Sequence, residues 1–320
     1  MDDKTVFVKD FSMLSLKIFI VGYPEQGESV LCLLMEEQRV IFSFVVDSFS
    51  LNNGATHIVC DLLAEFKAQK INKFIWTHPD FDHSIGIEQL LDLYDINREA
   101  DIYISEGVIN SLDILKSHAC EVYNYLNKYY NTCTKYNLNK VSIFKGENRS
   151  LQVVEILEMS SGRVITCNLQ FIAPLSSKVI RQEFNKTKDY NAMSIMFILS
   201  LNKINYLFCG DIEDSTLVHI NKSFFKNTKF VKIPHHGSNT SLKLVEYLRI
   251  NTIKDAVAVS TVFKAKNLPM ESVIDCYKPI CQCLYCTSSG DKNFGYVQLD
   301  YDILKGDFVP KLVGNAIKVF

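Results

Sequence analysis

Runs of apolar, β-branched and aromatic residues near the start of the chain are separated by short polar stretches that contain turn residues. Such runs are typical of strands, and their close spacing predicts neighbouring strands in a meander. We expect these strands at residues 16–21, 28–34 and 39–46. Asp47 closes the third run.

A helical periodicity follows. Apolar residues at spacings of three and four predict an amphipathic helix packed on a sheet, formed by Ile58, Val59, Leu62, Leu63 and Phe66. Further along, the pattern predicts strands at residues 73–77, 193–201, 204–209, 230–233 and 256–260, and helices at 85–94, 108–130 and 241–248. Residues 141–174 mix short strands and loops. This alternation favours a sandwich of sheets flanked by helices over a helical bundle or an all-β barrel.

Composition narrows the class of protein. The 320 residues contain no Pro/Gly/Ser-rich linker, charge block or repeat, so we expect residues 1–320 to form a single α/β domain. Apolar residues make up 48% of the chain and charged residues 22%, which excludes a disordered or coiled-coil protein. The net charge of −2 excludes a strongly basic nucleic-acid binder but leaves room for a local basic groove.

The sequence also indicates a location. No apolar run reaches the ~20 residues of a membrane-spanning helix, so no membrane partner is expected. The opening residues 1–4 lack the basic cap and apolar stretch of a secretory signal, which favours a cytoplasmic location. In that reducing compartment the ten cysteines are expected to be thiols.

Three of the apolar runs end in side chains that are able to bind metals. Loops beyond the carboxyl ends of strands are where α/β folds assemble their sites. The three loops begin at His78, at Gly210-Asp211 and at Pro234-His235-His236. The first is the densest, with four candidate ligands at His78, Asp80, Asp82 and His83. A loop can turn such side chains inward together, and imidazoles with carboxylates suit Mn, Zn or Fe. The alternative is a solvated polar loop with an Asp that caps the next helix.

These motifs resemble those of the metallo-β-lactamase-fold hydrolases, whose signature is His-x-His-x-Asp-His after a strand. The His-Pro-Asp-x-Asp-His form at residues 78–83 is similar to that of the soluble domain of the ComEC/Rec2 competence DNA-uptake channels. Other motifs agree in order and spacing: a Gly-rich hairpin at residues 21–29, Asp47, the Asn-x-x-Ser pattern of Asn191 and Ser194, Gly210-Asp211, and Pro234-His235-His236-Gly237-Ser238. The likeness spans about residues 17–290.

The resemblance implies an αββα metallo-β-lactamase-like sandwich with two divalent metal ions at one edge, Zn or Mn, with Mg as a further option. The implied ligands are His78 and Asp80 for the first ion, Asp82 and His83 for the second, and Asp211 as a bridge.

One of two adjacent histidines would complete the second site. We favour His235 because it comes first after the strand, although the sequence leaves His236 open. Two such ions lower the pKa of a bridging water towards neutrality, and Asp82 would orient or deprotonate that water. By resemblance, the candidate substrate-binding residues are Asn191, Ser194, Ser238 and Ser288.

Two departures from the family pattern are visible. Asp80 stands where the signature has its second histidine, which tilts the preference of the first site from Zn towards Mn or Mg. The family's third-motif histidine has no convincing counterpart, because His118 lies in a predicted helix. We expect His118, and likewise His57 and His219, to be structural.

Two further groups remain open. Four cysteines lie close enough for a thiolate metal site, but their spacing equally suits a strand with buried thiols: Cys276, Cys281, Cys283 and Cys286. Basic residues precede two of the motifs, with Phe184 and Tyr190 interleaved, at Lys178, Arg181, Lys186, Lys188, Lys222, Lys226, Lys229 and Lys232. They predict either a solvated lysine face or a groove for a phosphate backbone with stacking surfaces for bases.

The leading hypothesis is therefore a metal-dependent hydrolase of phosphodiesters, a nuclease or nucleotide phosphodiesterase, with a nucleic acid or nucleotide as substrate. A second hypothesis keeps the fold and changes the substrate to a lactone, thioester or β-lactam. A third is a diiron oxygen or nitric-oxide reductase, which shares only the carboxylate at Asp80. The fourth is a binding protein with a degenerate metal site.

Overall fold

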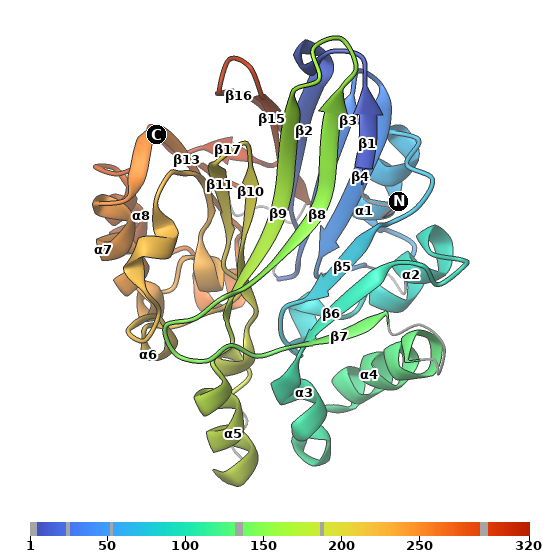
Figure 1. Cartoon of the computed structure of the whole chain (residues 1–320). Helices are drawn as coiled ribbons and strands as arrows, with labels where there is room; N and C mark the ends of the chain where they lie inside the picture. The colour runs from blue at the N-terminus through green and yellow to red at the C-terminus, as the bar shows by residue number, and fades with distance from the viewer. Residues whose placement is uncertain (1–4, 24–25, 52–53, 132–136, 186–188, 289–293) are drawn as a thin grey trace.

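Two sheets form the centre of the molecule in the computed structural model, which describes residues 5–23, 26–51, 54–131, 137–185, 189–288 and 294–320 (Figure 1). Sheet B consists, in spatial order, of β16 (Asp307–Gly314), β15 (Gly295–Asp302), β2 (Leu14–Gly22), β3 (Glu28–Glu36), β4 (Arg39–Val46), β5 (Lys73–Trp76), β6 (Asp101–Ser105) and β7 (Leu138–Val141).

Sheet A is built mainly from the second half of the chain. In spatial order it consists of β1 (Thr5–Val8), β8 (Arg149–Glu158), β9 (Val164–Ala173), β10 (Met196–Leu201), β11 (Ile204–Phe208), β12 (Thr228–Lys232), β13 (Thr252–Ser260), β14 (Cys283–Cys286) and β17 (Ile317–Lys318). The ends of the chain cross over between the sheets. The N-terminal β1 pairs with β8 in sheet A, and the C-terminal β15 pairs with β2 in sheet B.

The two sheets pack face to face, and helices cover their outer faces. The helices are α1 (Ile58–Glu65), α2 (Ile87–Tyr94), α3 (Glu106–Asn110), α4 (Ser117–Tyr130), α5 (Ser176–Asn185), α6 (Asp214–Leu217), α7 (Lys243–Arg249) and α8 (Glu271–Tyr277). Helices α1, α2 and α4 lie on one side of the molecule, and α6, α7 and α8 lie on the other (Figure 1). None of the helices in the described ranges has both the length and the apolar composition that a membrane crossing requires.

Three apolar cores account for these layers. Between the sheets, Phe44 of sheet B packs against Phe197 and Phe208 of sheet A, with ring centroids 6.2 and 5.8 Å apart. In β2, Ile20 belongs to this central core, whereas its neighbour Phe19 packs under α1 and α2. A third core joins sheet A to α6, α7 and α8. Strand residues alternate between faces, so strands buried on both sides are apolar throughout. The expected αββα sandwich is confirmed.

Two predicted segments differ from the structure. Residues 141–174 contain the ten-residue strands β8 and β9, which pair as a hairpin. The helix expected over residues 108–130 is interrupted, because the hydroxyl of Tyr190 donates to Ile114 O at 3.2 Å and accepts from Lys116 N at 3.1 Å. These two bonds satisfy backbone groups that a continuous helix would have paired internally.

Candidate metal centre

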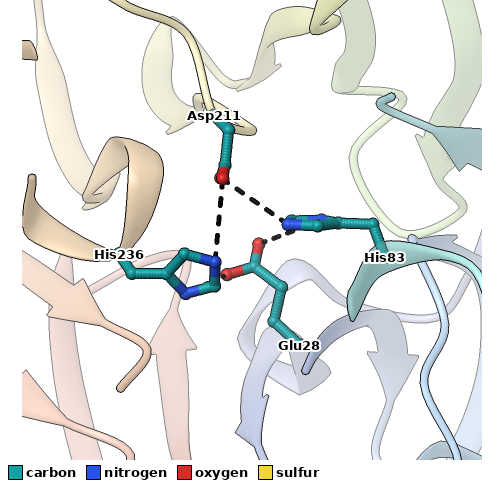
Figure 2. A group of neighbouring side chains, drawn as sticks. All are labelled: Glu28, His83, Asp211 and His236. Carbon is teal, nitrogen blue, oxygen red and sulfur yellow. Dashed lines mark ion pairs between the residues drawn. The ribbon is translucent and has the colours of Figure 1, made fainter. Parts of the chain in front are cut away.

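Loops from both sheets meet at one edge of the sandwich because they follow parallel strands. In sheet B, β4 and β5 are parallel, with Val46 opposite Ile75. In sheet A, β11, β12 and β13 are parallel, with Phe208 opposite Lys232. The carboxyl ends of parallel strands lie at a common edge, so the residues that follow them are neighbours. Figure 2 shows side chains from the two sheets meeting there.

The loop after β5 turns its polar side chains towards a common point. After His78 it forms a 3₁₀ turn over Phe81–His83. His78 Nε2 lies 3.6 Å from Asp80 Oδ2, and His83 Nε2 lies 3.7 Å from Asp82 Oδ2. His78, Asp82 and His83 are buried, so the alternative of a solvated polar loop is wrong for these side chains.

Asp211, which follows β11, contacts histidines from both sheets (Figure 2). Its Oδ1 lies 3.7 Å from His83 Nε2, and its Oδ2 lies 3.7 Å from His236 Nε2. Oδ2 is also 3.9 Å from His78 Nε2. The preceding Gly210 has a φ of 51°, which glycine adopts without strain. The two oxygens of Asp211 thus face three imidazoles, two from the loop of sheet B and one from sheet A.

His236 lies in this cluster and His235 does not, which corrects the preference for the first histidine of the pair. His236 is buried, and its Nε2 lies 3.2 Å from Asp82 Oδ2. His235 Nδ1 instead lies 3.2 Å from Glu213 Oε1 and 3.0 Å from Thr240 Oγ1, towards the surface. Both histidines have left-handed backbones, with φ of 47° and 50°, at a cost of about 1–2 kcal/mol each. Because of this turn, the two adjacent side chains point in different directions.

Glu28, at the start of β3, is a member of the cluster that the sequence analysis missed. Its Oε2 lies 2.6 Å from Lys232 Nζ and accepts a hydrogen bond from Thr261 Oγ1 at 2.5 Å. Oε2 is 3.4 Å from His236 Nδ1, and Oε1 is 3.8 Å from His83 Nδ1. These nitrogens are not the ones that face Asp211, so Glu28 approaches each ring at its other nitrogen, and Figure 2 shows its carboxylate between the two rings. A charged residue that opens a largely apolar, buried strand was the available signal, because a buried carboxylate needs a partner.

Asp47 has the corresponding place behind the loop of residues 78–83. Its Oδ1 accepts from Thr77 N at 2.7 Å, and its Oδ2 accepts from Thr77 Oγ1 at 2.6 Å. Oδ2 also lies 2.7 Å from His83 Nδ1. The Thr77 hydroxyl oxygen is 3.0 Å from His78 Nδ1. The acid that closes β4 therefore holds two histidines, one directly and one through Thr77.

The charges of the cluster stabilise one another. Burial alone would lower the pKa of His83, but the carboxylates of Asp47 and Asp82 raise this pKa well above its ordinary value. Burial would raise the pKa of Asp211, yet His236 and His83 hold it well below the ordinary value. Burial and the neighbouring His83 lower the pKa of His78, which keeps this imidazole neutral and its lone pair available.

Unpaired buried atoms show that these residues suit a metal ion. His78 Nε2, His83 Nε2 and Asp211 Oδ1 are buried without a hydrogen-bond partner. Buried polar atoms are normally paired, so three orphans that face one point call for a cation. Glu28, His83, Asp211 and His236 offer donor atoms within 4.8 Å of one another. Imidazole nitrogens and carboxylate oxygens together are ligands for divalent ions such as Zn and Mn.

Comparisons with known proteins gave matches among solved structures. No protein-family profile and no curated protein matches the sequence. Among solved structures, the chain is similar to a Thermotoga maritima protein provisionally assigned as a metallo-beta-lactamase, with 16% identity, a TM-score of 0.33, and coverage of 62% of this chain and 79% of that one. FEZ-1 metallo-beta-lactamase from Legionella gormanii shows 13% identity, a TM-score of 0.33 and 75% coverage of each chain. The order of the layers, with two sheets between two sets of helices, follows from the sheets and apolar cores of this chain.

The candidate substrate-binding residues have different local partners. Asn191 Nδ2 donates to Glu213 Oε1 at 3.2 Å, and Ser194 Oγ accepts from the backbone of Asp211. Ser238 Oγ accepts from Thr240 Oγ1 at 3.1 Å. Ser288 lines a pocket of about 320 Å³ under α8, and its neighbours Ser289 and Gly290 lie outside the described residues. Ser194 and Ser238 therefore stabilise the loops that carry Asp211 and His236.

The other histidines have local partners. His57 caps α1 by accepting from Cys60 N at 3.4 Å. His118 lies on α4 as expected, and its Nε2 is 3.2 Å from Pro79 O, so it supports the loop of residues 78–83. His219 follows α6 and is half-buried. Each contact or position agrees with the structural interpretation of these three residues.

In the described residues the cysteines do not gather into the thiolate site considered for them, and two of the lysines, Lys229 and Lys232, are buried and not at the surface. In the described part of the chain the cysteines are free, and Cys283 packs in the central core whereas Cys281 and Cys286 pack under α8. Lys232 is buried against Glu28, and Lys229 lies 3.7 Å from Asp307 at the other end of β12. Among the other basic residues, Lys222 and Lys226 precede β12, and Lys178 and Arg181 lie on α5. Lys186 and Lys188 lie outside the described residues, and the side chain of Phe184 is not described.

Proposed function

We propose that this chain is a metal-dependent hydrolase of phosphodiesters, either a nuclease or a nucleotide phosphodiesterase. The observation that carries the proposal is the convergence of three imidazoles and three carboxylates at one edge of the sandwich: His78, Asp80, Asp82, His83, Asp211 and His236. Four candidate ligands in one short loop, together with Asp211 and His236 from the opposite sheet, suit a pair of ions that bind the same anionic oxygens of a substrate.

The charge of the cluster supports divalent ions. Glu28 is paired with Lys232, and the other carboxylates around the cluster are those of Asp47, Asp80, Asp82 and Asp211. Such an excess of carboxylates favours divalent cations. We propose Mn or Zn, with Mg as a further option, because Asp80 gives the first position an additional hard oxygen ligand.

Two bound ions would supply a water that ionises near neutral pH and would hold the oxygens of the substrate. His78, Asp80 and Asp211 would hold the first ion, and Asp82, His83, His236 and Asp211 the second. Asp82 is close to the surface of the cluster, with 11% of its side chain exposed, so one of its oxygens can orient the water and accept its proton. Lys116 Nζ lies 3.4 Å from Asp80 Oδ1 and would bind an anionic substrate at the rim.

The substrate class rests on a sequence likeness. The His-Pro-Asp-x-Asp-His form at residues 78–83 is similar to that of competence DNA-uptake channels, which favours a nucleic acid or nucleotide over a carbonyl substrate. Phosphodiesters carry non-bridging anionic oxygens that two cations bind together, and a carboxylate-rich site suits that task.

Activity of the Mn²⁺-loaded protein tests the proposal. We expect cleavage of single-stranded DNA or of bis(4-nitrophenyl) phosphate, and we expect Asp82→Ala and Asp211→Ala to lower kcat at least about 10³-fold. Asp275→Ala is the matched control, because Asp275 is an exposed partner of Lys278 on α8. Unchanged turnover in both site variants would refute the mechanism. Turnover of a lactone, thioester or β-lactam without phosphodiester cleavage would replace the substrate class.

A further inference from the structure

Two buried threonines link histidines of the cluster to carboxylates behind them. Thr261 Oγ1, just after β13, lies 2.8 Å from His236 Nδ1 and 2.5 Å from Glu28 Oε2. Thr77 Oγ1, just after β5, lies 3.0 Å from His78 Nδ1 and 2.6 Å from an oxygen of the carboxylate that closes β4. The same chain of imidazole, hydroxyl and carboxylate thus occurs once on each sheet.

A hydroxyl has one proton, and its direction is fixed at Thr261. The Lys232 ammonium, 2.6 Å from Glu28 Oε2, keeps Glu28 a carboxylate, which can only accept hydrogen bonds. Thr261 must therefore donate its proton to Glu28. The hydroxyl oxygen of Thr261 can then only accept from His236, so His236 carries a proton on Nδ1, and Nε2, which faces Asp82 and Asp211, is the nitrogen left for a metal ion.

The same reasoning holds for Thr77. Asp47 already accepts from Thr77 N and from His83 Nδ1, as a carboxylate does. Thr77 donates its hydroxyl proton to Asp47 and accepts from His78 Nδ1. The Nε2 atom of His78 therefore also carries a lone pair, and it faces Asp211.

We propose that Thr77 and Thr261 are positioning residues that hold His78 and His236 in the tautomer with the proton on Nδ1, so that Nε2 binds metal. Thr77 acts on the ion at the loop of residues 78–83, and Thr261 acts on the ion at His236. This inference rests on the metal centre of the proposed function and not on its substrate.

Metal titrations of hydroxyl-deletion variants test it. Valine keeps the shape of threonine and removes the hydroxyl, whereas serine keeps the hydroxyl. We expect Thr261→Val to weaken Mn²⁺ or Zn²⁺ binding at one of two positions about 10- to 100-fold, and Thr77→Val to weaken the other by a similar factor. Thr261→Ser should bind within about threefold of the unaltered protein. Equal losses in Thr261→Ser and Thr261→Val would overturn the proposal, because packing would then explain both.

Thr228→Val is the matched control. Thr228 is fully buried on β12 and donates its hydroxyl to Phe225 O at 2.6 Å, away from the cluster. Its loss should lower stability and leave metal affinity unchanged. An equal loss of affinity in this variant would contradict a specific role for Thr261.

A spectroscopic measurement on the unaltered protein does not depend on the variants folding. ¹⁵N chemical shifts of histidine distinguish a ring proton on Nδ1 from one on Nε2. In the Zn²⁺-loaded protein we expect His78 and His236 to carry the ring proton on Nδ1 and to bind the ion through Nε2, and a proton on Nε2 of either would overturn the inference for that residue. Metal binding without phosphodiester cleavage would refute only the proposed reaction, whereas unchanged affinity in the valine variants would refute only this inference.

Discussion

The two halves of the metal centre differ in how they are built. The half on sheet B comes from one short loop, where His78, Asp80, Asp82 and His83 lie within six positions. The half on sheet A combines separate loops after different strands, and its supporting carboxylate, Glu28, comes from the other sheet. The ligands of the compact loop can be recognised in the sequence because they are closely spaced. The ligands of the dispersed half cannot, because their positions depend on the direction of the backbone and on contacts between the sheets.

The largest effect should come from the buried ion pair of the dispersed half. Lys232→Met leaves the Glu28 carboxylate buried without its cation, so we expect a loss of about 3–5 kcal/mol in the free energy of unfolding. Urea denaturation measures it. The control is Lys229→Met on the same strand, because the partner of Lys229, Asp307, is 74% exposed. Adding Glu28→Gln to Lys232→Met should recover part of the lost free energy of unfolding. Equal stability of Lys232→Met and the unaltered protein would show that the ion pair does not stabilise the fold.

The next effect separates two adjacent histidines. His236→Ala removes a proposed ligand, and we expect at least about 100-fold weaker binding of one metal ion, measured by titration with Zn²⁺. His235→Ala should bind both ions within about threefold, since its ring contacts Glu213 and Thr240. Loss of an ion from His235→Ala, with binding intact in His236→Ala, would reverse the assignment.

The smallest effect concerns the rim of the compact half. Lys116 is 56% exposed, so water and salt screen its charge. We expect Lys116→Ala to raise KM for an anionic substrate about threefold at low salt, with kcat unchanged and the difference lost at high salt. Steady-state kinetics at two ionic strengths measure this. Lys128→Ala is the control, because Lys128 lies near the end of α4 and Lys116 precedes its start, and an equal rise there would indicate a general charge effect.

Sequence patterns predicted most of the fold and the compact half of the site. The strand at residues 39–46 matches β4, because its apolar run ends sharply at Asp47. The hairpin of β8 and β9 was unclear because the first four residues of β8 are exposed or half-buried and its register against β9 shifts between Gln152 and Val154. The break before α4 depends on Tyr190, which is distant in the sequence. No local pattern reveals such a contact.

The errors in the dispersed half have the same cause. Adjacent histidines differ only in the direction that a left-handed backbone gives them, and neighbouring residue types do not specify that backbone. Lys232 was expected at a surface groove because lysine is usually exposed, but its partner Glu28 lies about two hundred positions away. Pairs of this kind become visible only when both sheets are in place.

The crossing of the chain ends has a consequence during synthesis. Strand β2 is a nine-residue, largely apolar strand that is covered on one edge by β3 and on the other by β15. A ribosome makes β2 early and β15 only after residue 294, so the second edge of β2 stays open while nearly all of the intervening protein emerges. An open apolar edge recruits strands from other molecules. Newly made chains are therefore most prone to aggregate just before the hairpin of β15 and β16 is synthesised.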